Sequence, residues 1–218
     1  MADQASRQNR KRLLISGMLL TGILLYMMVR FYFLCLSLQL ESTGSVQQTI
    51  DHHGSLLMVM GELLMLSTIL CGCTFYNVRK LYFQNERVPT GLLVVSLALL
   101  SMACLAIVVK TGRLVYPVNG LPVIADDGLQ AAVAEIYGAW HLCNIMLGVF
   151  MISWAGSSWR PLWKYSGAVI GLAQILSTYF GQPVKPVPML MAIALSTAWM
   201  LMRGVSSNNG LESECWNG

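Results

Sequence analysis

Six apolar runs divide this chain of 218 residues, and short polar segments separate them. The hydrocarbon core of a bilayer is about 30 Å thick, and a helix of about 20 apolar residues crosses it. Because no water reaches that core, each crossing segment must satisfy its own backbone hydrogen bonds, which a helix does. We therefore predict an all-α integral membrane protein with one domain, residues 13–203, in which six transmembrane helices form a bundle. The helices are expected over residues 13–38, 55–76, 88–109, 129–154, 166–180 and 189–202.

The composition excludes an ordinary soluble fold. Hydrophobic residues make up 56% of the chain and charged residues only 11%, against about 25% charged in a typical soluble domain. The net charge of +4 comes from basic residues clustered beside the apolar runs, a pattern that indicates membrane topology and not a nucleic-acid surface. The expected partner is therefore the lipid bilayer, and no nucleic acid partner is predicted.

The positions of the basic residues predict the orientation, because Lys and Arg near membrane spans stay on the cytoplasmic side. Residues 1–12 form a basic N-terminal segment and residues 204–218 a polar tail, and both are predicted to be cytoplasmic. We expect an integral protein of a bacterial inner membrane with its N-terminus inside. This arrangement leaves three basic residues outside, Lys110, Arg113 and Lys185, and places ten inside: Arg7, Arg10, Lys11, Arg12, Arg79, Lys80, Arg87, Arg160, Lys164 and Arg203.

Polar side chains inside the apolar runs are the candidates for function. A charged residue near the bilayer centre costs about 2.5–3.5 kcal/mol on insertion scales, so its presence needs a reason. Arg30, Glu62 and Glu135 are expected at similar depths in the outer half of the bundle. We predict that they converge there in a polar pocket, with Arg30 bonded to at least one carboxylate and the other free to exchange a proton or bind a ligand. The alternative interpretation is a structural polar cluster that fixes helix register.

The fourth apolar run adds two further candidate residues, His141 and Asn144. They are three positions apart, so they share one face of a helix. Glu135 lies about 120° away around the same helix, which argues against a catalytic dyad with His141. Haem ligation by His53 and His141 would need two ligands at similar depth, but they are expected about 18 Å apart along the bilayer normal.

No motif for a cofactor, a metal or a nucleophile occurs in the chain. The sequence lacks a glycine-rich phosphate loop, a His-Glu-x-x-His helix and a Gly-x-Ser-x-Gly elbow, each of which supplies a known chemistry. The cysteines lack the spacing of a zinc site or a disulfide framework. We therefore predict no cofactor, no metal and no catalytic residue.

Two pairs of small residues have the spacing of close helix contacts. Gly167 and Gly171 lie four positions apart in the fifth run, and Ala194 and Ala198 lie four apart in the sixth. Small residues on one face let two helices approach closely and gain dispersion contacts. All four are predicted to pack against neighbouring helices.

Three stretches resemble a family of uncharacterised bacterial six-span proteins. They are the run that opens with Gly61-Glu62-Leu63-Leu64 and closes with Tyr76-Asn77-Val78-Arg79-Lys80, the pair Pro188-Met189, and the last span ending at Arg203-Gly204. These are similar to motifs of the domain of unknown function four-three-eight-six. Where that family has a proline and a final-span Glu, this chain has Asn77 and Ile193. The resemblance implies the six-span architecture and no particular chemistry.

The sequence therefore favours a membrane-embedded binding or accessory protein without enzymatic activity, with a small apolar or cationic ligand in the polar pocket. A small proton-coupled transporter that uses Glu62 or Glu135 is the first alternative. An intramembrane enzyme that uses His141 is the second. The oligomeric state stays open.

Overall fold

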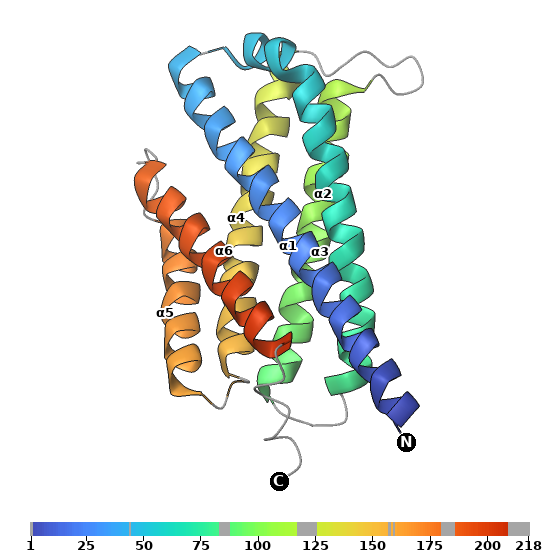
Figure 1. The fold of residues 1–218 in the computed structure, drawn as a ribbon. Coiled ribbons are helices and arrows are strands. Elements are labelled where there is room, and N and C mark those ends of the chain that lie inside the picture. The colour runs from blue at the N-terminus through green and yellow to red at the C-terminus, as the bar shows by residue number, and fades with distance from the viewer. Residues whose placement is uncertain are drawn as a thin grey trace.

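A computed structural model of the chain consists of six helices joined by short segments (Figure 1). It describes the backbone of residues 2–43, 45–82, 88–116, 126–156, 158, 160–179 and 186–208, and within these the side chains of residues 14, 17–40, 45–73, 91–116, 128–156, 158, 160–179 and 187–203. Over these residues there is no strand. The helices are α1 (Ala2–Thr43), α2 (Val46–Tyr82), α3 (Val88–Val115), α4 (Asp126–Gly156), α5 (Pro161–Ser177) and α6 (Pro186–Asn208).

Four helices contain a stretch long and apolar enough to cross a membrane. The stretches are Gly17–Leu40, Val46–Cys73, Gly91–Val115 and Gly128–Gly156. The prediction of an all-α protein with membrane-spanning helices is thereby confirmed at this level. α5 has 17 residues, and the apolar part of α6 is Val187–Arg203. Both are shorter than the four stretches above. The count of six crossings stays a prediction.

Consecutive helices pack against one another, and the first helix also contacts the last. The closest packing joins α1 to α2, α2 to α3, α3 to α4 and α4 to α5, while α6 lies against α5 and α1. The start of α1 and the end of α6 lie at the same end of the bundle (Figure 1). α5 and α6 form a shorter pair, and α1 to α4 extend beyond their turn.

The helices are longer than the hydropathy of the chain predicts. Residues 39–54 were expected to form a loop, but α1 continues to Thr43 and α2 begins at Val46. Ser45 caps α2 because its Oγ accepts the backbone N–H of Gln48 (3.3 Å), and side-chain capping of this kind stabilises a helix start. The side chains of Gln47 and Asp51 add a hydrogen bond one turn apart (2.8 Å).

The predicted loop over residues 110–128 is also shorter than expected. α3 continues through Lys110 and Arg113 to Val115, and α4 begins at Asp126. Residues 117–125 lie outside the described residues. So do residues 180–185, within the proline-rich connection, and residues 209–218 of the predicted polar tail.

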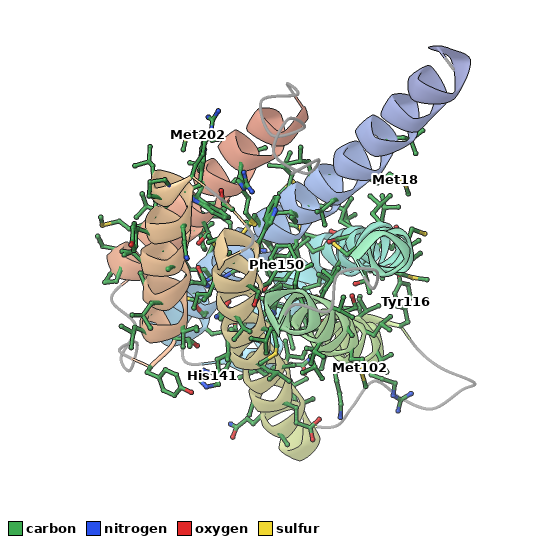
Figure 2. All side chains as sticks on the ribbon, turned by 90° about the horizontal axis from the view of Figure 1, so that it is seen from below. Met18, Met102, Tyr116, His141, Phe150 and Met202 are labelled. Atoms are coloured by element: carbon green, nitrogen blue, oxygen red, sulfur yellow. The ribbon has the colours of Figure 1, made fainter. Side chains whose placement is uncertain are left out.

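The core fills the space between α1, α2, α3 and α4, and α6 contributes Ile193, Trp199 and Met200. Phe150 of α4 points into the middle of the bundle, whereas Met102 of α3 lies at its edge (Figure 2). One face of α3 is apolar and exposed, at Leu92, Val95, Leu99, Met102, Leu105 and Val109. Such a face is suited to contact with lipid, as the absence of charge in this run predicts.

Candidate functional site

Arg30 is buried in the core of the bundle. Its side chain is 2% exposed, and none of its three guanidinium nitrogens has a hydrogen-bond partner among the described residues. Along the apolar stretch Gly17–Leu40, Arg30 lies about 20 Å from the start and about 15 Å from the end. The buried side chain therefore does not reach the headgroups. The predicted bond from Arg30 to a carboxylate is wrong, because its nitrogens have no partner among the described residues.

The two intramembrane carboxylates pair with α3 instead. The Tyr116 hydroxyl donates to Glu62 Oε1 (3.3 Å), and the Lys110 ammonium forms an ion pair with Glu135. Both carboxylate side chains are exposed on the outside of the bundle. Their predicted convergence with Arg30 is also wrong, because α3 extends beyond its expected end and brings Lys110 and Tyr116 beside them.

Tyr116 lies just beyond the apolar stretch of α3. Partial loss of solvation and the adjacent Glu62 carboxylate both raise the pKa of its phenol. The phenol is therefore protonated at neutral pH and acts as the hydrogen-bond donor to Glu62.

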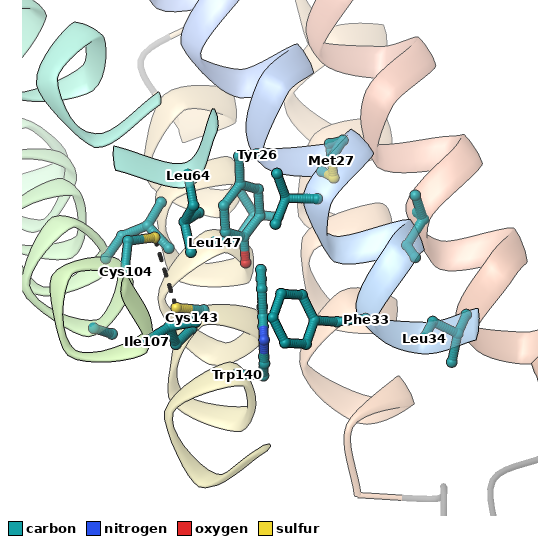
Figure 3. Packing of buried hydrophobic residues seen from close by; sticks show 14 of the residues in the cluster. Tyr26, Met27, Phe33, Leu34, Leu64, Cys104, Ile107, Trp140, Cys143 and Leu147 are labelled. Atoms are coloured by element: carbon teal, nitrogen blue, oxygen red, sulfur yellow. Dashed lines mark hydrogen bonds between the residues drawn. The ribbon is translucent and has the colours of Figure 1, made fainter. Parts of the chain in front are cut away.

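Aromatic side chains of α1 and α4 lie near the turn of α1 that contains Arg30. Tyr26 and Phe33 flank Arg30 one turn to either side on α1. Both pack against the ring of Trp140 on α4 (Figure 3), with centroid separations of 5.6 Å for Tyr26 and 5.2 Å for Phe33. The Tyr137 hydroxyl adds a hydrogen bond to the Phe33 carbonyl (3.2 Å). Trp140 therefore packs against α1 at the turns on either side of Arg30.

Five residues on this part of α1 and α4 have buried polar atoms without a partner among the described residues. Four of the five are themselves buried, and we call these four, Tyr26, Arg30, Trp140 and Asn144, the Arg30 cluster. The fifth, Tyr32, is partly exposed. The unpaired atoms of the Arg30 cluster are the Tyr26 hydroxyl, the three Arg30 nitrogens, Trp140 Nε1 and Asn144 Oδ1. Leaving a buried polar group unpaired costs about 1–3 kcal/mol, and more for a charged group. Native structures contain few such atoms, so a concentration of them needs an explanation.

His141 is separate from the Arg30 cluster. It lies at the edge of the bundle (Figure 2), where its Nδ1 is 2.6 Å from the Thr178 hydroxyl. Its ring also meets the ring of Tyr179 edge to face, with centroids 5.0 Å apart. Asn144, which was expected to share a site with His141, is 2% exposed and lies in the core.

The glycine pair of α5 lies at helix contacts. A Cβ atom at Gly167 would come within 2.3 Å of the Trp199 ring, and one at Gly171 within 2.8 Å of the Gly148 carbonyl oxygen. Gly148 on α4 is thus part of the same contact, although it was not predicted from the sequence. Two hydrogen bonds join α5 to α6, from Ser196 to Gln174 (3.0 Å) and from Trp199 to Ser166 (3.1 Å).

The alanine pair of α6 does not have the predicted role. Ala194 and Ala198 are exposed, whereas Ser196 and Trp199 of the same helix are buried. The spacing of the alanines matched a packing motif, but the helix is rotated so that another face, which includes Ile193, Ser196 and Trp199, meets the core. The prediction that they pack against a neighbouring helix of this chain is therefore wrong.

Two small cavities flank the level of the Arg30 cluster. One has a volume of about 10 Å³ and is lined by Tyr26 together with residues of α2, α3 and α4. The other has a volume of about 20 Å³ and is lined by Phe33 and mostly apolar residues. A buried water needs about 10–15 Å³, so each cavity accommodates about one water as the side chains stand.

Sulfur atoms gather near the first cavity, where Cys104 Sγ of α3 lies 3.9 Å from Cys143 Sγ of α4 (Figure 3). Both thiols are buried and free. Within the described part of the chain, no three side chains of His, Cys, Asp or Glu come together in a way that could hold a metal ion.

No family model, no curated protein and no solved structure matches this chain. The resemblance to the uncharacterised six-span family therefore stays a prediction, and the candidate site is defined by its geometry alone.

Sequence reasoning singled out Arg30 and Asn144 but not Tyr26 and Trp140. A signal for Tyr26 was present, since it lies four positions before Arg30 and so shares its helix face. Trp140 also precedes Asn144 by four positions. Nothing in the sequence showed that these two faces meet.

Proposed function

We propose that this protein is a membrane-embedded binding or accessory protein without enzymatic activity, and that the Arg30 cluster is its binding site. The observation that carries this proposal is the Arg30 guanidinium, which is 2% exposed and has no hydrogen-bond partner. A buried charge is retained at a cost, and intramembrane ionisable residues are commonly functional for that reason.

A purely structural role fits Arg30 less well. A residue that fixes helix register does so by hydrogen bonds to neighbouring helices, as Ser67 does by donating to the Gly22 carbonyl (2.6 Å). Arg30 makes no such bond. A molecule that enters the bundle would supply the hydrogen-bond acceptor that the guanidinium N–H groups lack.

The topology that accompanies this proposal has six crossings, with both termini in the cytoplasm of a bacterial cell. The common location of the start of α1 and the end of α6 supports an even number of crossings (Figure 1). The bias of ten basic residues against three in the sequence supports the orientation.

The alternative functions use residues away from the core. For a proton-coupled transporter, Glu62 and Glu135 lie on the outside of the bundle. Glu62 accepts a hydrogen bond from Tyr116, directly after α3, and Glu135 pairs with Lys110 of α3. For an intramembrane enzyme, the contact of His141 with the Thr178 hydroxyl is the one observation in favour, since a base beside a hydroxyl is part of many nucleophilic sites. The Arg30 cluster has the stronger support because its polar atoms are both buried and unpaired.

Native mass spectrometry of the protein purified in a mild non-ionic detergent tests the proposal. We expect wild-type protein to retain a bound small molecule that Arg30→Met loses. Lys110→Met is the matched control, because it removes an exposed cation that is already paired with Glu135. Equal retention by wild-type protein and Arg30→Met, or no retained molecule in either, would contradict the proposal.

A further inference from the structure

We infer that the group bound by the Arg30 cluster is an oxyanion, a carboxylate or a phosphate. This inference rests on the proposed function and specifies the chemistry of the ligand. The sequence predicted an apolar or cationic ligand, but the unpaired atoms at the site favour a group that accepts hydrogen bonds.

The unpaired atoms of the Arg30 cluster are mostly donors. Arg30 contributes its three guanidinium nitrogens, Tyr26 its hydroxyl and Trp140 its indole Nε1, while Asn144 Oδ1 is the single unpaired atom that only accepts. Guanidinium and indole N–H groups cannot accept hydrogen bonds. A ligand with two or more acceptor oxygens therefore matches the site, and a cation does not.

The geometry of guanidinium narrows the ligand further. Its planar arrangement of N–H groups matches the paired oxygens of a carboxylate or phosphate, and such bidentate pairs are among the strongest hydrogen-bonded contacts in proteins. Because Trp140 contacts both Tyr26 and Phe33, its indole lies at the level of Arg30. Donors of α1 and α4 thus lie at neighbouring levels of the core.

The described part of the chain supplies no carboxylate at this site. The structure describes the side chains of three carboxylates, and all three are engaged elsewhere. Asp51 accepts from Gln47, Glu62 from Tyr116 and Glu135 from Lys110. Within the described residues, the positive charge of Arg30 is therefore left without a counter-ion, which an oxyanion would provide.

The two cavities mark places where the side chains of the core are incompletely packed. Tyr26 lines the first cavity and Phe33 the second, so incomplete packing occurs on both sides of Arg30. The second cavity is bounded by apolar residues such as Leu36, Ile50 and Ile136, which suit an alkyl chain. The oxyanion can therefore belong to a free anion or to a single-chain lipid, and the experiment has arms for both sources.

Thermal unfolding of wild-type protein in maltoside detergent, with and without added ligand, tests the inference. The oxyanion probes are acetate, inorganic phosphate, laurate and dodecyl phosphate, and dodecanol is the neutral probe with the same chain length. At about one hundred times its Kd, an oxyanion that binds should raise the melting temperature by about 5–10 °C. Dodecanol should leave it unchanged.

The pattern of response identifies the source. A rise with acetate or phosphate indicates a free anion, and a rise only with laurate or dodecyl phosphate indicates a lipid headgroup. Arg30→Met should abolish the rise and Lys110→Met should preserve it. Tyr26→Phe and Trp140→Phe each remove one donor, and Tyr26→Phe does so with little change in shape. Each should weaken binding about tenfold.

The inference is overturned if no oxyanion stabilises wild-type protein, or if dodecanol stabilises it as much as laurate does. Native mass spectrometry separates this failure from failure of the proposed function. An Arg30-dependent ligand that proves to be neutral would leave the binding function standing and remove the oxyanion. The absence of any Arg30-dependent ligand would remove both.

Discussion

The contact between α4 and α5 and the level of Arg30 between α1 and α4 are built in opposite ways. At the first, three glycines bring backbones together, and an added Cβ at Gly148, Gly167 or Gly171 would meet a neighbour within 2.8 Å. At the second, small cavities flank the aromatic rings, and six side-chain polar atoms of the Arg30 cluster have no partner among the described residues.

This difference separates what holds the bundle together from what the bundle can bind. Close backbone approach gains dispersion contacts and needs no outside partner. A buried guanidinium without an acceptor is destabilising on its own and becomes favourable only when a partner arrives. The first region should therefore tolerate no enlargement, while the second should tolerate the loss of its polar groups.

The largest effect is expected from Gly171→Leu, because its side chain would collide with the Gly148 carbonyl and with Ile152. Overpacking of this kind costs about 3 kcal/mol, which corresponds to a fall of about 6–12 °C in melting temperature. Ala198→Leu is the matched control, since the same enlargement falls on an exposed face of α6. An unchanged melting temperature for Gly171→Leu would show that α4 and α5 are not in close contact.

A smaller effect is expected from Ser196→Ala. It removes the only described donor to Gln174 Oε1, and Gln174 is fully buried. Hydrogen bonds between membrane helices contribute about 0.6 kcal/mol on average and up to about 1.7. We expect a fall of about 2–4 °C in melting temperature, which the second change Gln174→Leu should partly restore. A fall that persists in the double variant would show that the bond is not the cause.

Much of the fold follows from the sequence, because apolar runs bounded by charged segments predict helices across a membrane. The ends were less predictable. Ser45 caps the start of α2, and the connection from α1 to α2 is therefore short. The polar run after Val109 still forms helix as far as Val115. Hydropathy measures transfer into lipid and does not report where a helix stops in water.

The site was harder to predict because it depends on how each helix is rotated about its axis. Arg30, Glu62 and Glu135 were predicted to lie together because their expected depths in the membrane are similar. In the structure, Glu62 and Glu135 face outward and Arg30 faces inward. The alanine and glycine pairs have the same spacing, yet only the glycines lie in the core. Rotation is set by packing against neighbours, which a single sequence does not show.

The smallest effect is expected from Glu135→Gln. The ion pair with Lys110 is exposed, with 46% and 56% of the two side chains accessible, and pairs of this kind contribute between 0 and about 1 kcal/mol. Neither stability nor ligand retention should change measurably in unfolding and native mass spectrometry experiments. Loss of a proton-dependent transport activity in reconstituted vesicles would instead favour the transporter alternative.

The stability of Arg30→Met without ligand tests the central claim most directly. Replacing a buried charged group by an apolar side chain of similar volume is often stabilising, by about 1–4 kcal/mol, when nothing in the chain satisfies that charge. We therefore expect the melting temperature of ligand-free protein to rise by about 2 °C or more in detergent. A fall of the size seen when a buried pair is broken, about 3–5 kcal/mol, would show that Arg30 has a partner within the bundle and serves its structure.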